Sequence, residues 1–202
     1  MKPHHHQLSA VLPNGKSILL RTVLAEDKSR FQEGFSLLSP ESRYLRFFSY
    51  LKELSEGQLN YLSKVDQLNH VAWGALDESH HPTLGVGVGR FIRVESCPNC
   101  AEIAITVIDE FQGKGLGTLL FAVMYLLAQA HEVDKFVGSV LAANQGVVRR
   151  LREINATLKG GEGQFSFEVP IYQDFADLPS TTTGQRLRTW LEKMASQLFL
   201  PG

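Results

Sequence analysis

The spacing of hydrophobic and polar residues along the chain predicts alternating strands and helices. Every-second-residue patterns and short apolar runs predict strands at residues 16–23, 71–76, 84–94, 101–108, 135–142, 157–159 and 164–169. Three- and four-residue spacing predicts helices at residues 26–38, 40–48, 116–131, 144–154 and 184–198. A further helix begins after Ser55, which has the spacing of a capping box with Gln58. This order of elements predicts one domain of mixed α/β (α+β) class.

The same pattern predicts the limits of the domain. We expect residues 1–13 to be a flexible N-terminal tail and residues 14–175 to form the domain. Residues 176–202 are expected to be a linker followed by a C-terminal helix. The apolar residues of that helix recur at helical spacing and form a candidate homodimer surface; they are Leu187, Leu191, Met194 and Leu198.

The most informative local feature is a glycine-rich turn between the strand at 101–108 and the helix at 116–131. Alternate glycines let a backbone approach phosphate oxygens, and the free N–H groups of a first helical turn attract anions. The turn therefore predicts a phosphate-bearing cofactor. The residues predicted to bind it are Gln112, Gly113, Lys114, Gly115, Leu116, Gly117 and Thr118.

Two other phosphate-binding loops do not fit this sequence. A dinucleotide fingerprint needs a third glycine where Thr118 stands, and an acidic residue after the next strand, which here ends in Ala142-Ala143-Asn144. A Walker loop ending at Gly15-Lys16-Ser17 would need a glycine in place of Ala10. It would also open a helix, whereas a strand pattern follows.

With those loops excluded, the chain resembles the GNAT superfamily of acyl-CoA-dependent N-acetyltransferases. The resemblance rests on the turn at 112–118 and on the flanking segments 101–107 and 140–144. Residues 38–48 are similar to a stretch of the bacterial protein-lysine acetyltransferase branch. Together these segments lie within residues 14–169. The resemblance implies a central, mostly antiparallel, twisted sheet with splayed fourth and fifth strands, flanked by helices.

The resemblance also implies acetyl-CoA as co-substrate. Ile105, Thr106 and Val107, at the end of the family's fourth strand, would contact the pantetheine arm, and a backbone N–H there would polarise the thioester carbonyl. Residues 112–118 would hold the pyrophosphate. Asn144 would cap the next helix and contact the cofactor, although an asparagine cap needs no ligand.

Glu102 is the candidate general base. An acceptor amine of lysine type has a reference pKa of about 10.4 and must lose a proton before it attacks a thioester. Glu102 lies on a strand whose residues 102, 104 and 106 share one face, and desolvation there would raise its pKa toward a useful range. The resemblance implies a base acting through water at this position. The alternative is an ion pair with Arg90 or Arg93.

The acceptor is expected to be a primary amine. Residues 39–48 favour a protein lysine, and a small-molecule amine remains open. Many superfamily members carry a tyrosine as general acid where this chain has Leu151, and a Gly-Phe pair where it has Asn155-Ala156. These departures keep open a non-catalytic protein that binds or senses acyl-CoA.

Composition narrows the choice of partners. The net charge of −1, with 44% hydrophobic and 20% charged residues, describes an ordinary globular protein and argues against nucleic acid as the partner. No apolar run is long enough to span a bilayer, and residues 1–6 lack the apolar core of a signal peptide. We therefore expect a cytoplasmic protein with no membrane partner.

The sequence also has a Cys-x-x-Cys motif, Cys97 to Cys100. A zinc site needs about four ligands, and neither a second such pair nor a His-x-x-x-His accompanies it. His80 and His81 are the plausible additional ligands, and residues 4–6 form a histidine tract in the expected tail. We expect the motif to lie in a hairpin turn and the protein to need no metal.

Overall fold

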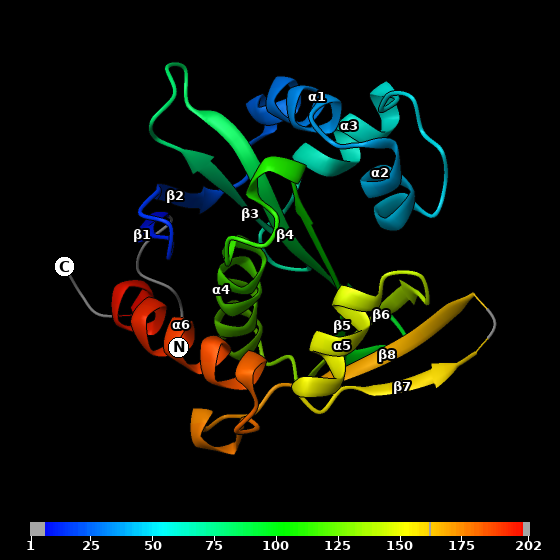
Figure 1. The fold of residues 1–202 in the computed structure, drawn as a ribbon, viewed down its shortest axis with the longest axis vertical. Helices are drawn as coiled ribbons and strands as arrows, with labels where there is room; N and C mark the ends of the chain where they lie inside the picture. Colours follow the sequence, from blue (N-terminus) through cyan, green and yellow to red (C-terminus); the bar gives the residue numbers. More distant parts are fainter. Residues whose placement is uncertain (1–6, 162, 200–202) are drawn as a thin grey trace.

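The computed structural model describes residues 7–161 and 163–199. Its centre is an eight-stranded sheet in the order β1-β2-β3-β4-β5-β6-β8-β7 (Figure 1). The strands are β1 (Gln7–Val11), β2 (Ser17–Thr22), β3 (His70–Asp77), β4 (Leu84–Val94), β5 (Cys97–Val107), β6 (Lys135–Leu141), β7 (Thr157–Gly160) and β8 (Gln164–Pro170). Neighbouring strands are antiparallel except for the parallel pair β5 and β6.

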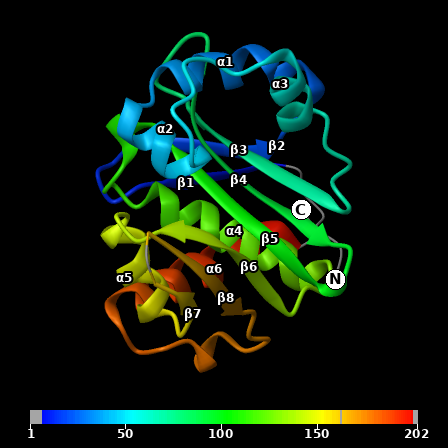
Figure 2. The same ribbon diagram turned by 90° about the vertical axis from the view of Figure 1, so that its right-hand side faces the viewer.

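Helices cover both faces of the sheet. They are α1 (Lys28–Ser36), α2 (Pro40–Phe47), α3 (Glu56–Ser63), α4 (Leu116–Ala130), α5 (Gln145–Glu153) and α6 (Thr182–Phe199), with short 3-10 turns η1 (Ala25–Asp27), η2 (Asp109–Phe111) and η3 (Phe175–Asp177). Figures 1 and 2 show α1–α3 grouped together, with α4 at the middle of the sheet and α6 alongside α4. The expected mixed α/β class and mostly antiparallel, twisted sheet are confirmed.

Glycines in β4 explain how closely α4 approaches the sheet. A Cβ atom added to Gly87 would lie 3.0 Å from a side-chain carbon of Leu120, and one added to Gly89 would lie 3.0 Å from Met124. Real Cβ contacts are rarely that short, so only glycine lets the helix lie this close. The register between β3 and β4 also shifts beside Leu76, as at a β-bulge. β4 thus combines a close approach of a helix with a β-bulge, and both are typical of strands that contain glycine.

The N-terminal end differs from the prediction. Residues 7–13 were expected to belong to a flexible tail, but Gln7–Val11 form the edge strand β1, paired with β2 from Gln7 opposite Arg21 to Val11 opposite Ser17. Leu8 and Ala10 point into the core, with 4% of each exposed. The alternation of buried and exposed residues in β1 is only five residues long, which is too short to predict a strand. The strand is recognised only through its pairing with β2. Residues 1–6, including the histidine tract, lie outside the described residues.

The C-terminal helix is part of the core. The side chains of Leu187, Leu191, Met194 and Leu198 are at most 1% exposed, because α6 packs along α4. The prediction of a homodimer surface at these residues was therefore wrong: the chain itself covers them. A hydrogen bond also attaches the linker before α6 to the end of α5: the Thr181 hydroxyl donates to the Glu153 carbonyl oxygen at 2.6 Å.

We predict that α6 contributes substantially to stability. Leu191→Ala should lower the free energy of unfolding by about 2–5 kcal/mol, because it removes a fully buried side chain and leaves a cavity. Glu192→Ala, at the neighbouring exposed position, should change it by less than about 0.5 kcal/mol. Urea unfolding of both variants measures the difference. Equal, small effects would mean that α6 is not part of the cooperative core.

Candidate functional site

The site is built around the separation of β5 from β6. These strands pair over only three positions, Cys100 with Lys135, Ala101 with Phe136 and Glu102 with Val137. Beyond Glu102, β6 continues along β8 while one edge of β5 stays unpaired. The expected splay is therefore confirmed.

Strand geometry identifies the peptide groups on this open edge. Ile108 N–H donates to the Val86 carbonyl oxygen on β4 at 3.1 Å. Because successive peptide groups along a strand point to opposite sides, those of Ile105 and Val107 point away from β4 toward the opening. The Thr106 side chain instead lies on the sheet face beneath α2. The open edge offers backbone donors and acceptors to an extended ligand.

The glycine-rich loop connects this open edge to α4. Gly113 and Gly115 have φ angles of 72° and 93°, the left-handed region that glycine adopts without strain. Gly115 is the N-cap of α4, and no side chain caps the helix. Among the residues that the structure describes, the first N–H groups of α4, including those of Gly117 and Thr118, therefore have no side-chain acceptor. Such an N-terminus suits a phosphate group.

The Gln112 side chain stabilises this loop from within. Its Nε2 lies within hydrogen-bonding distance of three oxygens: Ser42 Oγ at 3.1 Å, and Val107 O and Asp109 Oδ1 at 3.2 Å. Burial would raise the pKa of Asp109, but hydrogen bonds from Ser39 and Ser42 hold it below its usual value. The start of α2 is thus tied to the loop. Because the Gln112 side chain already forms hydrogen bonds within the protein, we infer that Gln112 would bind a ligand through its backbone N–H.

Asn144 caps α5. Its Oδ1 accepts a hydrogen bond from the Val147 N–H at 3.3 Å, so the expected structural role is confirmed. Leu151, where many superfamily members carry a tyrosine, is 7% exposed and packs in the core. This position therefore presents no acid. Asn155, just after α5, has a φ angle of 59°.

Glu102 lies at the edge of an open groove. The groove has a volume of about 310 Å³ and crosses β5, β6, β8 and β7 on the face opposite α4; it is lined by Glu102, Val137, Gly138, Ser139, Thr157, Lys159, Ser166, Phe167 and Glu168. The Glu102 side chain is exposed, so the desolvation considered from the sequence is absent. Its carboxylate is accessible to a substrate and to water.

The alternative role of Glu102 in an ion pair with Arg90 or Arg93 is not realised. Arg90 donates to the Leu62 carbonyl oxygen at 3.2 Å, and Arg93 donates to the His131 carbonyl oxygen at 2.6 Å. No salt bridge to Glu102 forms within residues 7–161 and 163–199. The charge of Glu102 instead acts on Arg46 of α2, where it opposes the lowering of the Arg46 pKa by burial.

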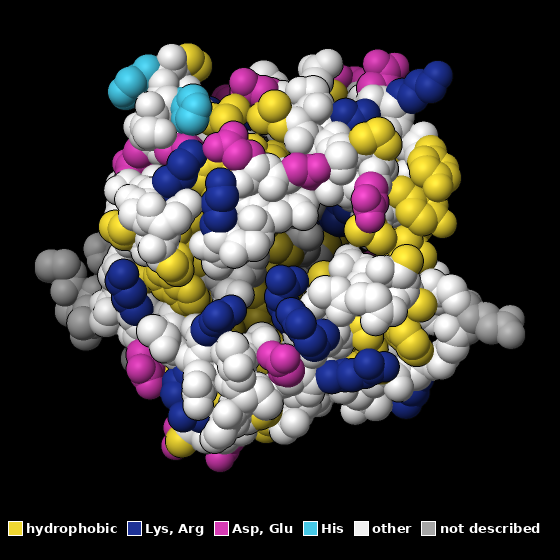
Figure 3. All heavy atoms as spheres, in the orientation of Figure 1, with side chains coloured by type: hydrophobic (Ala, Val, Ile, Leu, Met, Phe, Trp, Pro, Cys, Tyr) yellow, Lys and Arg dark blue, Asp and Glu magenta, His cyan; other side chains and the backbone are white. Residues whose placement is uncertain are grey.

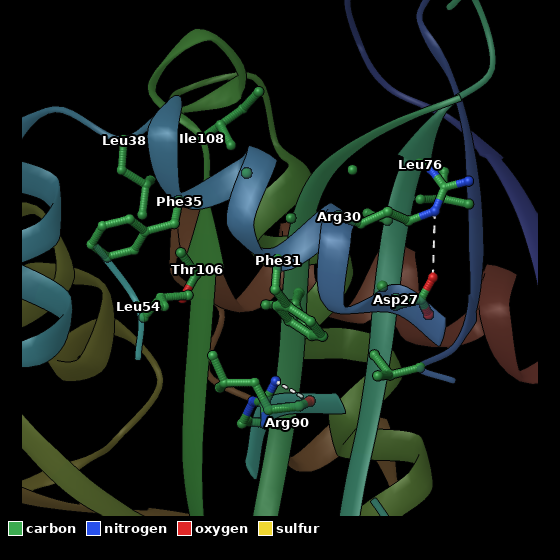
Figure 4. Close-up of a pocket in the computed structure, with 18 of the residues that line it drawn as sticks. Asp27, Arg30, Phe31, Phe35, Leu38, Leu54, Leu76, Arg90, Thr106 and Ile108 are labelled. Atoms are coloured by element: carbon green, nitrogen blue, oxygen red, sulfur yellow. Dashed lines mark hydrogen bonds and ion pairs between the residues drawn. The ribbon is translucent and has the colours of Figure 1, made fainter. Parts of the chain in front are cut away.

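A second, smaller cavity lies beneath α1–α3, on the other side of Thr106 from the open edge. Its volume is about 90 Å³, and its wall is mostly apolar. Figure 4 shows Phe31 above Arg90, with Thr106 on the neighbouring strand. Arg46 Nε donates to Thr106 Oγ1 at 2.9 Å. The sequence pattern gives Arg46 no role, because only the docking of α2 brings it to β5.

Arg90 is held by His70. Arg90 Nη1 lies 3.0 Å from His70 Nε2, and the arginine must be the donor because it has no acceptor. Burial and the charge of Arg90 lower the pKa of His70 to about 4. His70 is therefore neutral near pH 7 and accepts this hydrogen bond.

The Cys-x-x-Cys motif does not form the hairpin turn. Residues 95 and 96 form the turn, and Cys97 begins β5. The two cysteines are joined by a disulfide bond. Within the part of the chain that the structure describes, no group of three or more His, Cys, Asp or Glu side chains is arranged to hold a metal ion.

One face of the molecule has a hollow with basic side chains around it. Figure 3 shows a hollow near the centre of the face toward the viewer, with hydrophobic side chains inside and Lys and Arg side chains gathered around it.

Among the described residues, no helix is both long and apolar enough to cross a membrane.

Comparison with solved structures identifies the fold. The GNAT domain of PAT from S. lividans has a TM-score of 0.76 at 23% identity, with 84% of this chain and 99% of that domain covered. The structure of yncA from Salmonella typhimurium with its cofactor acetyl-CoA has a TM-score of 0.60 at 13% identity, with 81% and 99% covered. The protein has the GNAT fold.

The chain is also similar in sequence to curated acetyltransferases. An acetyltransferase of Pseudomonas aeruginosa is 29% identical over 136 residues, covering 67% of this chain and 73% of that protein. Acetyltransferase Pat of Mycolicibacterium smegmatis is 31% identical over 142 residues, or 70% of this chain. The match covers 42% of Pat, less than half its length. No protein-family model matches. The GNAT fold and these similarities together support an N-acetyltransferase that resembles the protein acetyltransferase branch.

We predict that His70 makes stability depend on pH. Its pKa of about 4 in the folded state is below the unfolded value of about 6.5, so the unfolded chain binds more protons between these values. The contribution is fully present above about pH 6.5 and is lost as the pH falls toward 4. His70→Gln should therefore flatten the dependence of the unfolding free energy on pH in this window.

The matched control is His81→Asn, at an exposed position in the loop between β3 and β4. It should leave the slope as in the unsubstituted protein. Chemical denaturation at several pH values between 4 and 7 measures all three proteins. An unchanged slope in His70→Gln would contradict a neutral, hydrogen-bonded histidine at this position.

Proposed function

We propose that the protein transfers an acetyl group from acetyl-CoA to the side-chain amine of a protein lysine, by direct attack in a ternary complex. The observation that carries the proposal is the alignment of an open strand edge with an uncapped helix N-terminus, beside an exposed glutamate. The first two features suit a pantetheine arm and a pyrophosphate. The third suits removal of a proton from an amine.

The cofactor site in this proposal uses mainly the backbone. Peptide groups of Ile105 and Val107 on the open edge pair with the arm, and the Thr106 side chain faces the acyl group from the other side. The peptide N–H groups of residues 112–118 hold the pyrophosphate, with the α4 dipole behind them. Asn144, at the start of α5, contacts the cofactor from the side of the opening formed by β6. Acetyl-CoA supplies the acyl group as an activated thioester.

Glu102 is the general base of the proposed reaction. A lysine amine is almost fully protonated near neutral pH, and its reference pKa is about 10.4. The Glu102 carboxylate accepts the proton from the amine nitrogen through water, which reaches it because the side chain is exposed. The neutral amine then attacks the thioester carbonyl. A backbone N–H of the open edge stabilises the oxyanion that develops.

Direct transfer needs no protein nucleophile. The two cysteine sulfurs are bonded to each other, and the described residues hold no free cysteine. Cys100 also lies five residues from Ile105 along β5, about 16 Å at the usual strand rise. Neither cysteine is therefore suited to carry the acetyl group.

The shape of the groove supports a protein acceptor. The groove of about 310 Å³ is open along the sheet, so a lysine presented on a polypeptide can reach Glu102 from solvent. Similarity to the protein acetyltransferase branch points the same way. A small-molecule acceptor would be expected to meet a more enclosed pocket.

We predict that turnover depends on Glu102. Glu102→Gln should lower kcat/KM for amine-dependent thiol release by about 100-fold or more, since a positioned base contributes about 10²–10⁴-fold. Glu95→Gln, an exposed glutamate in the turn before β5, is the matched control and should retain turnover. The assay supplies acetyl-CoA with lysine peptides, polyamines and amino acids in turn. Tight acetyl-CoA binding without transfer to any amine would instead favour a non-catalytic binding protein.

We also predict that the loop conformation controls cofactor affinity. Gly115→Ala should raise the Kd for acetyl-CoA about tenfold, because a φ of 93° strains any other residue by roughly 1–2 kcal/mol. Gly57→Ala in α3, where the new Cβ finds only ordinary contact, should leave the Kd unchanged. Calorimetric titration measures both. Equal affinities in the two variants would argue against a phosphate site at this loop.

A further inference from the structure

The cavity beneath α1–α3 contains two arginines, Arg46 and Arg90, that have no carboxylate partner among the described residues. Arg90 is 3% exposed, and its hydrogen-bond partners are His70 and the Leu62 carbonyl oxygen, both neutral. Arg46 is partly buried and donates to Thr106, which is also neutral. Within the described residues, no carboxylate lies at salt-bridge distance from either guanidinium.

Other arginines of the same cavity contrast with this pair. Arg21 forms a salt bridge with Asp27 at 2.6 Å, and Arg30 lies 3.4 Å from the same carboxylate (Figure 4). Buried charges are costly unless they are paired. One part of the cavity therefore has its own counter-charge, while the part next to β5 has none at contact distance.

Both unpaired groups keep their charge. Burial, and then the nearby charge of Arg46, lowers the pKa of Arg90 to about 10. Burial lowers the pKa of Arg46, and the charge of Glu102 opposes that effect. Near pH 7 the two guanidinium groups thus create a positive potential in a mostly apolar cavity. A small anion would be strongly favoured there.

The cavity is next to the proposed acyl position. Thr106, which faces the acyl group in the proposed complex, lines the cavity together with Arg46 and Arg90. The volume of about 90 Å³ is several times the roughly 10–15 Å³ of cavity that one water molecule needs. An acetyl group is too short to use this cavity, whereas an acyl group that is a few atoms longer would extend into it.

We propose that this cavity binds the free carboxylate of a dicarboxylic acyl group, so that succinyl-CoA is a donor for the protein besides acetyl-CoA. Arg46 binds the carboxylate directly, because its Nη groups are free to form the two-point contact that guanidinium and carboxylate favour. Arg90 supports it electrostatically. This inference rests on the proposed function for the transfer step, but not for binding of the donor.

The transfer follows the same chemistry as for acetyl. The amine nitrogen forms the new C–N bond to the thioester carbonyl carbon as the C–S bond breaks. Glu102 takes one proton from the ammonium form of the amine through water before the attack. The CoA thiolate leaves with the bonding electron pair and takes up the second proton, which the nitrogen releases as the C–N bond forms. The carboxylate held by Arg46 does not react and remains at the end of the transferred chain.

Binding of two matched donors tests the subsite without any acceptor. The first is succinyl-CoA, and the second is 4-methylpentanoyl-CoA, in which two methyl groups replace the carboxylate oxygens. Calorimetric titration of the unsubstituted protein should give a Kd on the order of tenfold lower for succinyl-CoA. Arg46→Gln should reduce this ratio to about one, and Arg46→Lys should retain part of it, since the charge remains without the planar fork.

The control variant is Arg30→Gln, in the same cavity wall but already paired with Asp27, and it should keep the ratio of the unsubstituted protein. Equal Kd values for the two donors in the unsubstituted protein would overturn the proposal. It would also be overturned if Arg46→Gln kept the same ratio of Kd values as the unsubstituted protein. Acetyl transfer to lysine peptides is measured in parallel. Its absence would refute the proposed function, while the Kd ratio would still decide the carboxylate subsite.

Discussion

The early separation of β5 from β6 is the constraint on which the candidate site depends. Two parallel strands that stayed paired would satisfy each other's peptide groups and leave no edge for a ligand. Here the pairing ends at Glu102. Because β6 continues along β8 instead, the sheet stays continuous while β5 keeps an open edge. The short loop after β5 then brings the uncapped start of α4 to the end of that edge. Both ligand-binding features thus follow from one break in the sheet.

The position of α4 depends on a second local property. Gly87 and Gly89 remove the side chains that would otherwise hold the helix away from β4. A helix displaced outward would carry its N-terminus, and therefore the loop at 112–118, away from the open edge. Glycines that weaken a strand in isolation are here what aligns the loop with the strand. The backbone of β4 thus influences a ligand site that it does not contact.

Much of this arrangement could be predicted from the sequence, and the exceptions share a cause. The glycine turn, the central strands and the α4 segment carry strong local patterns, and each was found. β1 was missed because its five-residue alternation gains meaning only from pairing with β2. Cys97 was assigned to a turn because the Cys-x-x-Cys motif lies between the predicted strands at 84–94 and 101–108, although the turn itself is residues 95 and 96. The apolar face of α6 was visible, but a periodic pattern does not say whether the same chain or a partner covers it.

Side chains from distant elements were beyond such patterns. Glu102 could be selected as a candidate because residue type and strand face are local properties, but its exposure depends on the absence of a helix over β6 and β8 on that face. Arg46 meets Thr106 only after α2 docks on the sheet, 60 residues away in sequence. In the proposed reaction, strand alternation gives β5 two roles: its open edge binds the cofactor, whereas the face that carries Glu102 and Thr106 is directed at the acceptor and the acyl chain. Substitutions in α2 should therefore alter which acyl group is accepted more than how tightly the nucleotide end of CoA is held.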